Sequence, residues 1–557
     1  MKEPQRFQHN ALAIALTSAV VFLATPAQAQ VAPDAGQTLQ QLKPPIAAPR
    51  ESKPLSIQTP VTSGFVLPGG SVVVVQTVSF ADNSVINQDS LQAALGDVAG
   101  KSFDLAGLRD LAELISEFYH ASGFPFARAV LPPQDMQQGA LRIEIIEGRY
   151  GLVQATSEET ALATQATPFL VDMKPGDVIE SAALERASLL LKDQPGIEIV
   201  PVIRPGTQAG TGDLIVQVTR DVDKRVTGDV GLDNAGNRYT GQTRARANLD
   251  INSPFMLGDQ IRINALVTKE QLMLGTLGYS LPLGASGLRG NVSYSITRYV
   301  LGKEFANLQA NGTAQVASAE LSYPLVRSQK TNLTLSSTYQ TKALQDSKDS
   351  TNIHESKSSQ SVPITLQFDN RDNVGGGGVT YGSVGSTLGK LKLDAAALDS
   401  NNTRGSFNKF NLDLVRLQFL SAGFSLMGRV SLQSTNKNLD SSEKMVLGGA
   451  GGVRAYPSGE ASGDAGVLTQ LELRYNTGSY TPYVFVDGGS IKTNVKPAPA
   501  VINNTRSLSG SGFGLRYQRV MWSVDSTLAW RNTGGTPQAD TSSDPKPRIW
   551  VNLGCQF

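Results

Sequence analysis

A glycine-rich stretch in the C-terminal half, GGVRAYPSGEASGDAG at 451–466, carries one positive charge, Arg454. Such a stretch could cradle a phosphate, lie free in solvent or fold into a confined space. A phosphate-binding loop ends in G-K-[S/T] and leads into a helix, and the surrounding LGGAGGVRAY has no such ending. The choice between a solvent-exposed loop and a confined loop depends on the elements around it.

Other residues that could do chemistry are scarce. Behind a predicted signal peptide only His120 and His354 remain, so a histidine-based zinc or haem site is not predicted. The single cysteine, Cys555, excludes an internal disulfide and is expected to be a small apolar strand residue. No G-x-S-x-G elbow is found. The sequence thus supports no enzyme, metal or cofactor, and a net charge of +1 gives no support for a nucleic-acid partner.

The N-terminus has the features of an export signal. Lys2 and Arg6 precede an apolar run at 11–24, and Ala-Gln-Ala follows, ending at Ala29. This pattern predicts a cleaved signal peptide at 1–29. No later stretch has the roughly 18 to 20 apolar residues of a membrane helix. The exported chain is therefore expected to be either soluble or a β-barrel.

The next region divides into a tether and two similar α/β units. Residues 30–60 combine a short helix at 35–43 with a Pro-rich linker, which should be extended. Residues 61–150 and 151–221 each combine strand patterns with amphipathic helical spacing. These patterns predict two small α/β domains with aliphatic cores.

In the first unit, Asp104 is expected to cap a helix that stops at Gly123. In the second unit, a helix is expected from Glu180 to about Asp193, before two further strands.

From 222 to 557 short alternating strands replace helical patterns, as in TRARANLDI at 243–251. A soluble sandwich would also alternate, but about 335 residues accommodate about 16 strand units of a membrane barrel. A short turn at 253–259 and a long polar loop expected at 345–359 fit the unequal connections of such barrels. The alternating last strand ends on Phe557. The predicted fold class is a membrane β-barrel of about 16 antiparallel strands, preceded by two α/β domains.

Several phrases resemble one family over essentially the whole mature chain: the outer-membrane transporters of two-partner secretion, of the hemolysin secretion and activation type. GFPFARAVLPPQ and LRIEIIEG lie in the first α/β unit, and DQPGIEIVPVIRPG lies in the second. QFDNRDNVGGGG and VDGG lie in the barrel. The resemblance implies two periplasmic polypeptide-transport-associated (POTRA) domains and an N-terminal helix that plugs the pore.

The resemblance also gives the glycine-rich stretch a place. It implies that a loop at 440–466 folds back into the barrel lumen and that Arg454 pairs with Asp487 of an F-x-D-x-G motif. Where this chain has Ala455, the family's commonest form has glycine, which leaves open whether the lock is loosened. The implied lock consists of Val453, Arg454, Ala455, Tyr456, Phe485, Asp487 and Gly489, with loop glycines Gly451, Gly452, Gly459 and Gly463.

The implied function is a pore that exports one large hemolysin- or adhesin-like exoprotein from periplasm to cell surface. The expected partners are this exoprotein, bound by the POTRA domains and the lumen, the outer-membrane lipids, and the barrel assembly machinery, which would read the terminal Phe557. A factor that inserts outer-membrane proteins is the alternative, and a passive porin is a weaker one. Two POTRA domains rather than three or five, and the plug-like helix, argue against the insertion factor, and a passive porin has no use for two periplasmic domains.

Overall fold

The structure, a computed structural model, describes residues 32–43, 48–49, 69, 71–136, 138–394, 399–499 and 503–557. The predicted signal peptide with its cleavage site at Ala29, and most of the Pro-rich linker, lie outside these residues. The helix expected at 35–43 forms as α1 (Ala35–Gln41), and its N-cap Asp34 accepts a hydrogen bond from the Gln37 amide at 2.8 Å. No helix in the described ranges is long and apolar enough to cross a membrane.

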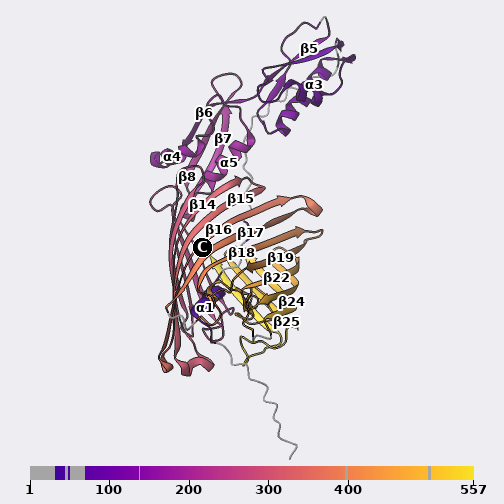
Figure 1. The fold of residues 1–557 in the computed structure, drawn as a ribbon. Coiled ribbons are helices and arrows are strands. Elements are labelled where there is room, and N and C mark those ends of the chain that lie inside the picture. The colour runs from indigo at the N-terminus through magenta and orange to yellow at the C-terminus, as the bar shows by residue number, and fades with distance from the viewer. Residues whose placement is uncertain are drawn as a thin grey trace, which may run out of the picture. The chain divides into compact units, whose positions relative to one another are not determined.

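The first α/β unit packs two helices on a small mixed sheet (Figure 1). Its elements are β1 (Val73–Val75), β2 (Thr77–Ala81), α2 (Gln88–Leu95), β3 (Lys101–Phe103), α3 (Leu105–Ala121), β4 (Arg128–Val130) and β5 (Ala140–Ile146). The strands order as β2-β5-β4, with β1 and β3 as a separate ribbon. Asp104 caps α3 as predicted, because its carboxylate accepts from the Gly107 amide at 2.8 Å. The spacing of α3 buries Ile115 and Tyr119 completely.

The second unit has its own aliphatic core around a three-stranded sheet. Its elements are β6 (Arg149–Thr156), α4 (Thr160–Ala166), η1 (Thr167–Leu170), α5 (Ser181–Lys192), β7 (Ile197–Pro205) and β8 (Thr211–Arg220). In the order β6-β8-β7, β6 runs parallel and β7 antiparallel to β8. The helix and strands expected here form close to their predicted limits.

Sixteen strands close into an antiparallel barrel, which confirms the predicted fold (Figure 1). They are β9 (Val226–Asp233), β10 (Arg244–Asn252), β11 (Gln260–Thr268), β12 (Met273–Pro282), β13 (Arg289–Val300), β14 (Ala310–Arg327), β15 (Thr331–Lys348), β16 (Ile353–Asp372), β17 (Gly378–Leu393), β18 (Gly405–Phe419), β19 (Phe424–Thr435), β22 (Ala465–Tyr475), β23 (Tyr480–Lys492), β24 (Thr505–Arg519), β25 (Trp522–Thr533) and β26 (Arg548–Gln556). Strand β26 closes the ring against β9.

The connections agree with the sequence at one end of the barrel and not at the other. The short turn at 253–259 joins β10 to β11 as expected. The long loop expected at 345–359 is wrong: β15 runs to Lys348, β16 begins at Ile353, and only the short η4 (Asp349–Thr351) separates them. The two strands remain paired through this polar stretch, for example at Gln345↔Ser356. Beyond the apolar band both faces of a strand are polar, so alternation disappears although pairing continues.

The segment between β19 and β22, residues 436–464, is called the lumen loop here. It forms a small hairpin of β20 (Met445–Val446) and β21 (Ser462–Gly463). Its Glu443 contacts Lys342 on β15, and its Arg454 contacts Trp550 on β26, nine strands further round the ring. A segment that touches such distant strands of a closed barrel must lie across its interior.

Candidate functional site

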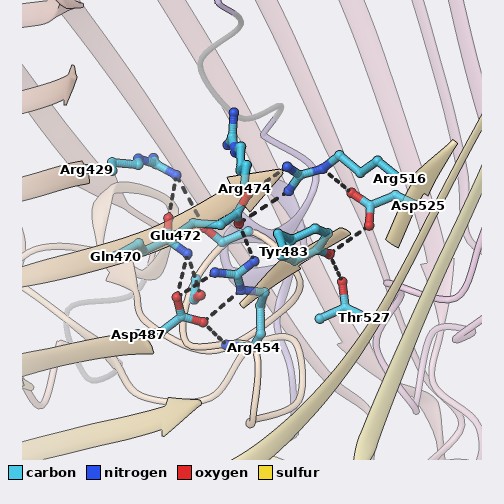
Figure 2. A network of polar contacts seen from close by, with 12 residues as sticks. Arg429, Arg454, Gln470, Glu472, Arg474, Tyr483, Asp487, Arg516, Asp525 and Thr527 are labelled. Carbon is cyan, nitrogen blue, oxygen red and sulfur yellow. Dashed lines mark hydrogen bonds and ion pairs between the residues drawn. The ribbon is translucent and has the colours of Figure 1, made fainter. Parts of the chain in front are cut away.

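Arg454, in the lumen loop, forms a two-pronged contact with Asp487 on β23 (Figure 2). The guanidinium donates from Nε to Oδ2 and from Nη2 to Oδ1, both at 2.9 Å. The Arg454 backbone amide also donates to Oδ2 at 3.1 Å. Asp487 is completely buried and Arg454 is 6% exposed. The structure thus brings together the two residues that the sequence paired, in the planar fork geometry that only arginine offers to a carboxylate.

A second carboxylate, Glu472 on β22, takes the remaining arm of Arg454. Arg454 Nη1 lies 2.9 Å from Glu472 Oε2. Glu472 also accepts from Arg474 at 2.7 Å and from Arg516 on β24 at 2.6 Å (Figure 2). Glu472 is not among the site residues that the sequence predicted. Cross-strand alternation indicates the face of a side chain and not its partner across the lumen.

The network continues past Glu472 without leaving a charge unpaired. Arg516 donates to Asp525 at 2.9 Å, and Asp525 accepts from the Tyr483 hydroxyl at 2.8 Å (Figure 2). Three arginines, Arg454, Arg474 and Arg516, therefore face three carboxylates, those of Glu472, Asp487 and Asp525. Charge balance of this kind lets ionised groups remain in a confined space.

Apolar and backbone contacts hold the loop around Arg454. The Phe485 ring centroid lies 3.5 Å from the Arg454 guanidinium carbon, and the Trp550 indole donates to the Arg454 carbonyl at 2.7 Å. Tyr456 donates its hydroxyl to the Thr533 carbonyl at 2.7 Å. Val453 and Tyr456 are completely buried in one hydrophobic cluster with Phe485. Trp550 is a contact that the sequence did not predict.

The electrostatics favour the charged form of Arg454. Burial lowers the pKa of its guanidinium, but the hydrogen bonds and charges of Asp487 and Glu472 outweigh burial and raise the pKa above its ordinary value. The arginine therefore stays protonated at every pH that the cell surface meets.

Ala455, where the family's commonest form has glycine, does not need a glycine backbone. Its φ is not positive, in contrast to Gly459 in the same loop, at +88°. The room for its methyl group comes from Gly510 on β24, where an added Cβ would lie 2.4 Å from the Ala455 Cβ. An alanine at 455 is therefore accommodated by a glycine opposite it.

The other glycines differ in how tightly they are held. An added Cβ would lie 1.9 Å from the Leu447 carbonyl oxygen at Gly452 and 2.3 Å from the Lys492 carbonyl oxygen at Gly463. At Gly489 on β23 it would lie 2.9 Å from the Leu447 side chain. Gly451 has nothing within 4 Å, so packing does not require glycine there.

The lumen loop has a second anchor at Glu443, which the sequence did not predict. Its carboxylate contacts Lys342 on β15 and Lys409 on β18 at 2.5 and 2.6 Å. Burial raises the pKa of Glu443, but the two lysine charges outweigh burial and hold that pKa well below its ordinary value.

Helix α1 contacts the lumen loop beside this second anchor. The carboxylate of its cap, Asp34, accepts from the Ser441 hydroxyl at 2.7 Å and lies 3.3 Å from Lys357 on β16. The Ala35 amide donates to Asp346 on β15 at 2.9 Å. The helix thus bridges the lumen loop and two strands of the barrel.

Phe557 lies at the seam of the barrel, where the last strand, β26, pairs with the first, β9. Its amide and carbonyl exchange hydrogen bonds with Gly228 at 3.0 and 2.9 Å, and its side chain is exposed. As for metals, the His, Cys, Asp and Glu side chains that the structure describes form no group able to hold one.

Comparisons with known proteins agree with this architecture. Residues 212–517 match the family described as haemolysin secretion/activation protein ShlB/FhaC/HecB, and residues 73–148 match the POTRA domain of ShlB type. The heme/hemopexin transporter protein HuxB of Haemophilus influenzae strain 86-028NP is 26% identical over 488 residues, 85% of either chain. The outer membrane transporter CdiB of Dickeya dadantii strain 3937 is 23% identical over 492 residues, again 85% of either chain. The solved structure of CdiB from Escherichia coli shares the fold, with a TM-score of 0.71 at 19% identity, covering 91% of this chain and 94% of that one.

Proposed function

Since this chain belongs to the haemolysin secretion/activation protein family ShlB/FhaC/HecB, we propose that its lumen loop is a lock fastened by Arg454, which sets the path of an exported polypeptide. The chain is an outer-membrane transporter that secretes a partner exoprotein by two-partner secretion, with its POTRA domains in the periplasm. The observation that carries the lock is the three-armed binding of Arg454 by two carboxylates on neighbouring strands.

The position of the lock follows from the geometry of transport. An unfolded chain that crosses the barrel must pass the lumen loop, which is held at Arg454 on one side and at Glu443 on the other. A loop fixed at both ends narrows the route and keeps the same route open for each cargo molecule. We infer that Arg454 keeps the loop tip against β22 and β23 while the remaining lumen carries the cargo.

Substitution of the arginine tests this lock. Arg454→Ala should lower secretion of the cognate exoprotein at least tenfold while the barrel remains in the outer membrane, because two buried carboxylates lose their shared partner. Arg519→Ala, at the exposed end of β24, is the control. Secretion and heat-modifiability of the barrel should be measured together. Wild-type secretion by Arg454→Ala would end the proposal.

We further propose that α1 is a plug. It is fastened by Asp34 to Ser441 and Lys357, and thus to both the loop and the wall. Deleting 35–43 should raise single-channel conductance in planar bilayers, because the deletion removes volume from the pore. An unchanged conductance would contradict the plug and leave the lock untouched.

Cargo capture is proposed for the free edges of the periplasmic sheets. Among the residues that the structure describes, β1 pairs only with β3 and β7 only with β8, and each carries an exposed valine, Val74 at 43% and Val200 at 50%. An extended segment can add to such an edge through main-chain hydrogen bonds, which tolerate many sequences. A photo-crosslinker at Val74 or Val200 should capture stalled cargo, whereas one at Leu114, exposed on α3, should not. Equal crosslinking at all three positions would argue against capture by strand edges.

The type of cargo and the route of assembly are also proposals. Relatives carry the names heme/hemopexin transporter, CdiB and hemolysin transporter, which favours a large hemolysin- or adhesin-like exoprotein. The exposed Phe557 at the seam is proposed as the signal for the barrel assembly machinery. Depletion of the transporter followed by a count of surface proteins distinguishes a secretion pore from a factor that inserts outer-membrane proteins. One lost exoprotein supports secretion, and many lost barrels would contradict it.

A further inference from the structure

A hollow of about 250 Å³ lies between strands β13 and β17, outside the lock and the plug. Its lining combines small side chains with larger polar and aromatic ones. Those that matter here are Tyr294, Ala317, Thr341, Gln360, Lys390 and Lys392.

Strand alternation places these side chains on the outer wall of the barrel. Lys342 on β15 and Lys357 on β16 bind acidic partners in the lumen and so point inward. Neighbouring residues on a strand point to opposite faces, and residues paired across strands point to the same face. Thr341, Gln360 and Lys390 form one cross-strand row through the pairs Thr341↔Gln360 and Gln360↔Lys390. This row therefore faces the lipid.

The end of the barrel at which β17 starts is periplasmic. Arg186 of the second α/β unit donates to the Pro324 carbonyl near the end of β14 at 2.9 Å. Because strands alternate in direction, β17 begins at that same end and runs toward the cell surface.

The polar residues of β17 mark both edges of an apolar band. Near its start, Thr380 accepts from Arg416 at 2.9 Å on the outer face. Between Thr380 and Lys390 the outer face carries Gly382, Val384, Ser386 and Leu388, the last exposed at 57%. The ten steps from residue 380 to residue 390 span about 33 Å along a strand, or about 25 Å across the membrane at a tilt of about 40°. That is the height of the apolar band of an outer-membrane barrel, so Lys390 lies at its outer edge.

The two lysines of this edge differ from those of the lumen. Lys342, Lys357 and Lys409, which point inward, each contact a carboxylate. Lys390 and Lys392 are exposed and form no ion pair with any residue that the structure describes. Exposed Tyr294 and Tyr339 lie on the same outer face, as aromatic residues do at the boundary between lipid tails and headgroups.

We propose that this hollow binds the phosphate of a phosphorylated glycolipid in the outer leaflet. The ammonium groups of Lys390 and Lys392 meet the phosphate charge, and Thr341 and Gln360 supply hydrogen-bond donors to the phosphate or sugar oxygens. The small lining residues, among them Ala317, leave room for the headgroup. The occupant is the lipid, held by its tails in the apolar band and by its phosphate at the lysines.

The test uses the full-length transporter in detergent micelles and bisphosphorylated lipid A as the probe. Native mass spectrometry should show bound lipid A, and the apparent Kd should rise about fivefold for each lysine removed, about 25-fold for Lys390→Gln with Lys392→Gln. Fully dephosphorylated lipid A should bind the wild-type protein as weakly as bisphosphorylated lipid A binds the double variant.

The control removes the same charge elsewhere, at Lys174→Gln with Lys330→Gln, both exposed at the periplasmic side. It should leave the Kd unchanged, and heat-modifiability should show that every variant is folded. Equal binding by the Lys390/Lys392 variant, or equal binding of dephosphorylated lipid A, would overturn the proposal. Displacement of lipid A by millimolar inorganic phosphate would also overturn it, since the site would then hold free phosphate rather than a lipid.

Discussion

The two anchors of the lumen loop both hold the loop through ion pairs, but the ion pairs are built differently. At the tip, the rigid fork of Arg454 binds Asp487 and Glu472, on the two strands that follow the loop in sequence. At the base, Glu443 lies between Lys342 and Lys409, which reach it from strands three positions apart in the ring. One anchor fixes a geometry, and the other neutralises a charge across the lumen.

The difference indicates which end of the loop can move. Arg454 has hydrogen bonds, a stacked ring and a balanced set of charges around it, so displacing it would expose several buried groups at once. The lysines at Glu443 are point charges on flexible stems and can exchange a carboxylate for water or for another acid. We therefore expect the Arg454 end to stay in place during transport and the Glu443 end, with α1 beside it, to open.

The largest expected effect comes from removing the carboxylate at the tip. Asp487→Ala leaves Arg454 buried with an unfilled fork, and loss of one partner of a buried ion pair costs roughly 3 to 5 kcal/mol. Urea unfolding of the refolded barrel should show this loss together with failed secretion. Asp250→Ala is the matched control, because Asp250 forms an ion pair with a largely exposed Arg262, a pair worth about 0 to 1 kcal/mol. Similar losses of unfolding free energy in Asp487→Ala and Asp250→Ala would show that the tip anchor stabilises the barrel no more than an exposed ion pair does.

Replacing Arg454 with lysine tests whether the tip anchor needs the fork geometry of arginine or only a positive charge. Arg454→Lys keeps the charge but cannot fill the two-pronged contact with Asp487, so we expect a loss of about 1 to 3 kcal/mol and partial secretion. Lys409→Arg at the base should be tolerated, because Glu443 needs a charge there rather than a fork. The two variants are compared by urea unfolding and by the secreted fraction of cargo. A well-tolerated Arg454→Lys would reduce the tip to an ordinary charge pair.

The sequence predicted the tip and missed the base for a physical reason. Arg454 and Asp487 belong to motifs that resemble those of a family, and strand alternation places Asp487 on one face with Phe485. Glu443, Lys342 and Lys409 carry no motif, and their meeting depends on how a loop of nearly thirty residues folds across a closed barrel. Alternation gives the face of each side chain, whereas its partner across the lumen depends on tertiary structure.

Sequence patterns also failed at 345–359, where a long loop was predicted and the structure has the paired ends of β15 and β16. The barrel and its strand number follow from the repeated alternation of apolar and polar residues. The outer ends of β15 and β16 leave the apolar band, so the pattern stops while backbone hydrogen bonding continues. Composition alone does not distinguish a polar strand from a polar loop.

At the base, neutralising the carboxylate should loosen the loop without unfolding it. Glu443→Gln leaves Lys342 and Lys409 close together without their shared counter-charge, so repulsion should favour a displaced loop. We expect more frequent openings of the channel in planar bilayers. Barrel unfolding should lose about 1 to 3 kcal/mol, because Lys342 and Lys409 are buried, but less than at Asp487, because a displaced loop lets water reach the two lysines. Glu320→Gln, on the lumen face of β14 away from the loop, controls for altered lumen charge. Equal opening in both variants would place the moving part elsewhere.

The smallest effect is expected at Ala455, the point where this tip departs from the family's commonest form. Ala455→Gly removes a methyl group that faces Gly510, and we expect a cost of about 0.5 to 1 kcal/mol with near-normal secretion, because the backbone there is not left-handed. Gly510→Ala should cost more, about 1 to 3 kcal/mol, since its new methyl would lie 2.4 Å from that of Ala455. The double variant should recover most of the loss, because it moves the methyl group from the loop to β24. Urea unfolding of the four proteins measures the coupling, and additive losses would mean that the two positions do not share one space.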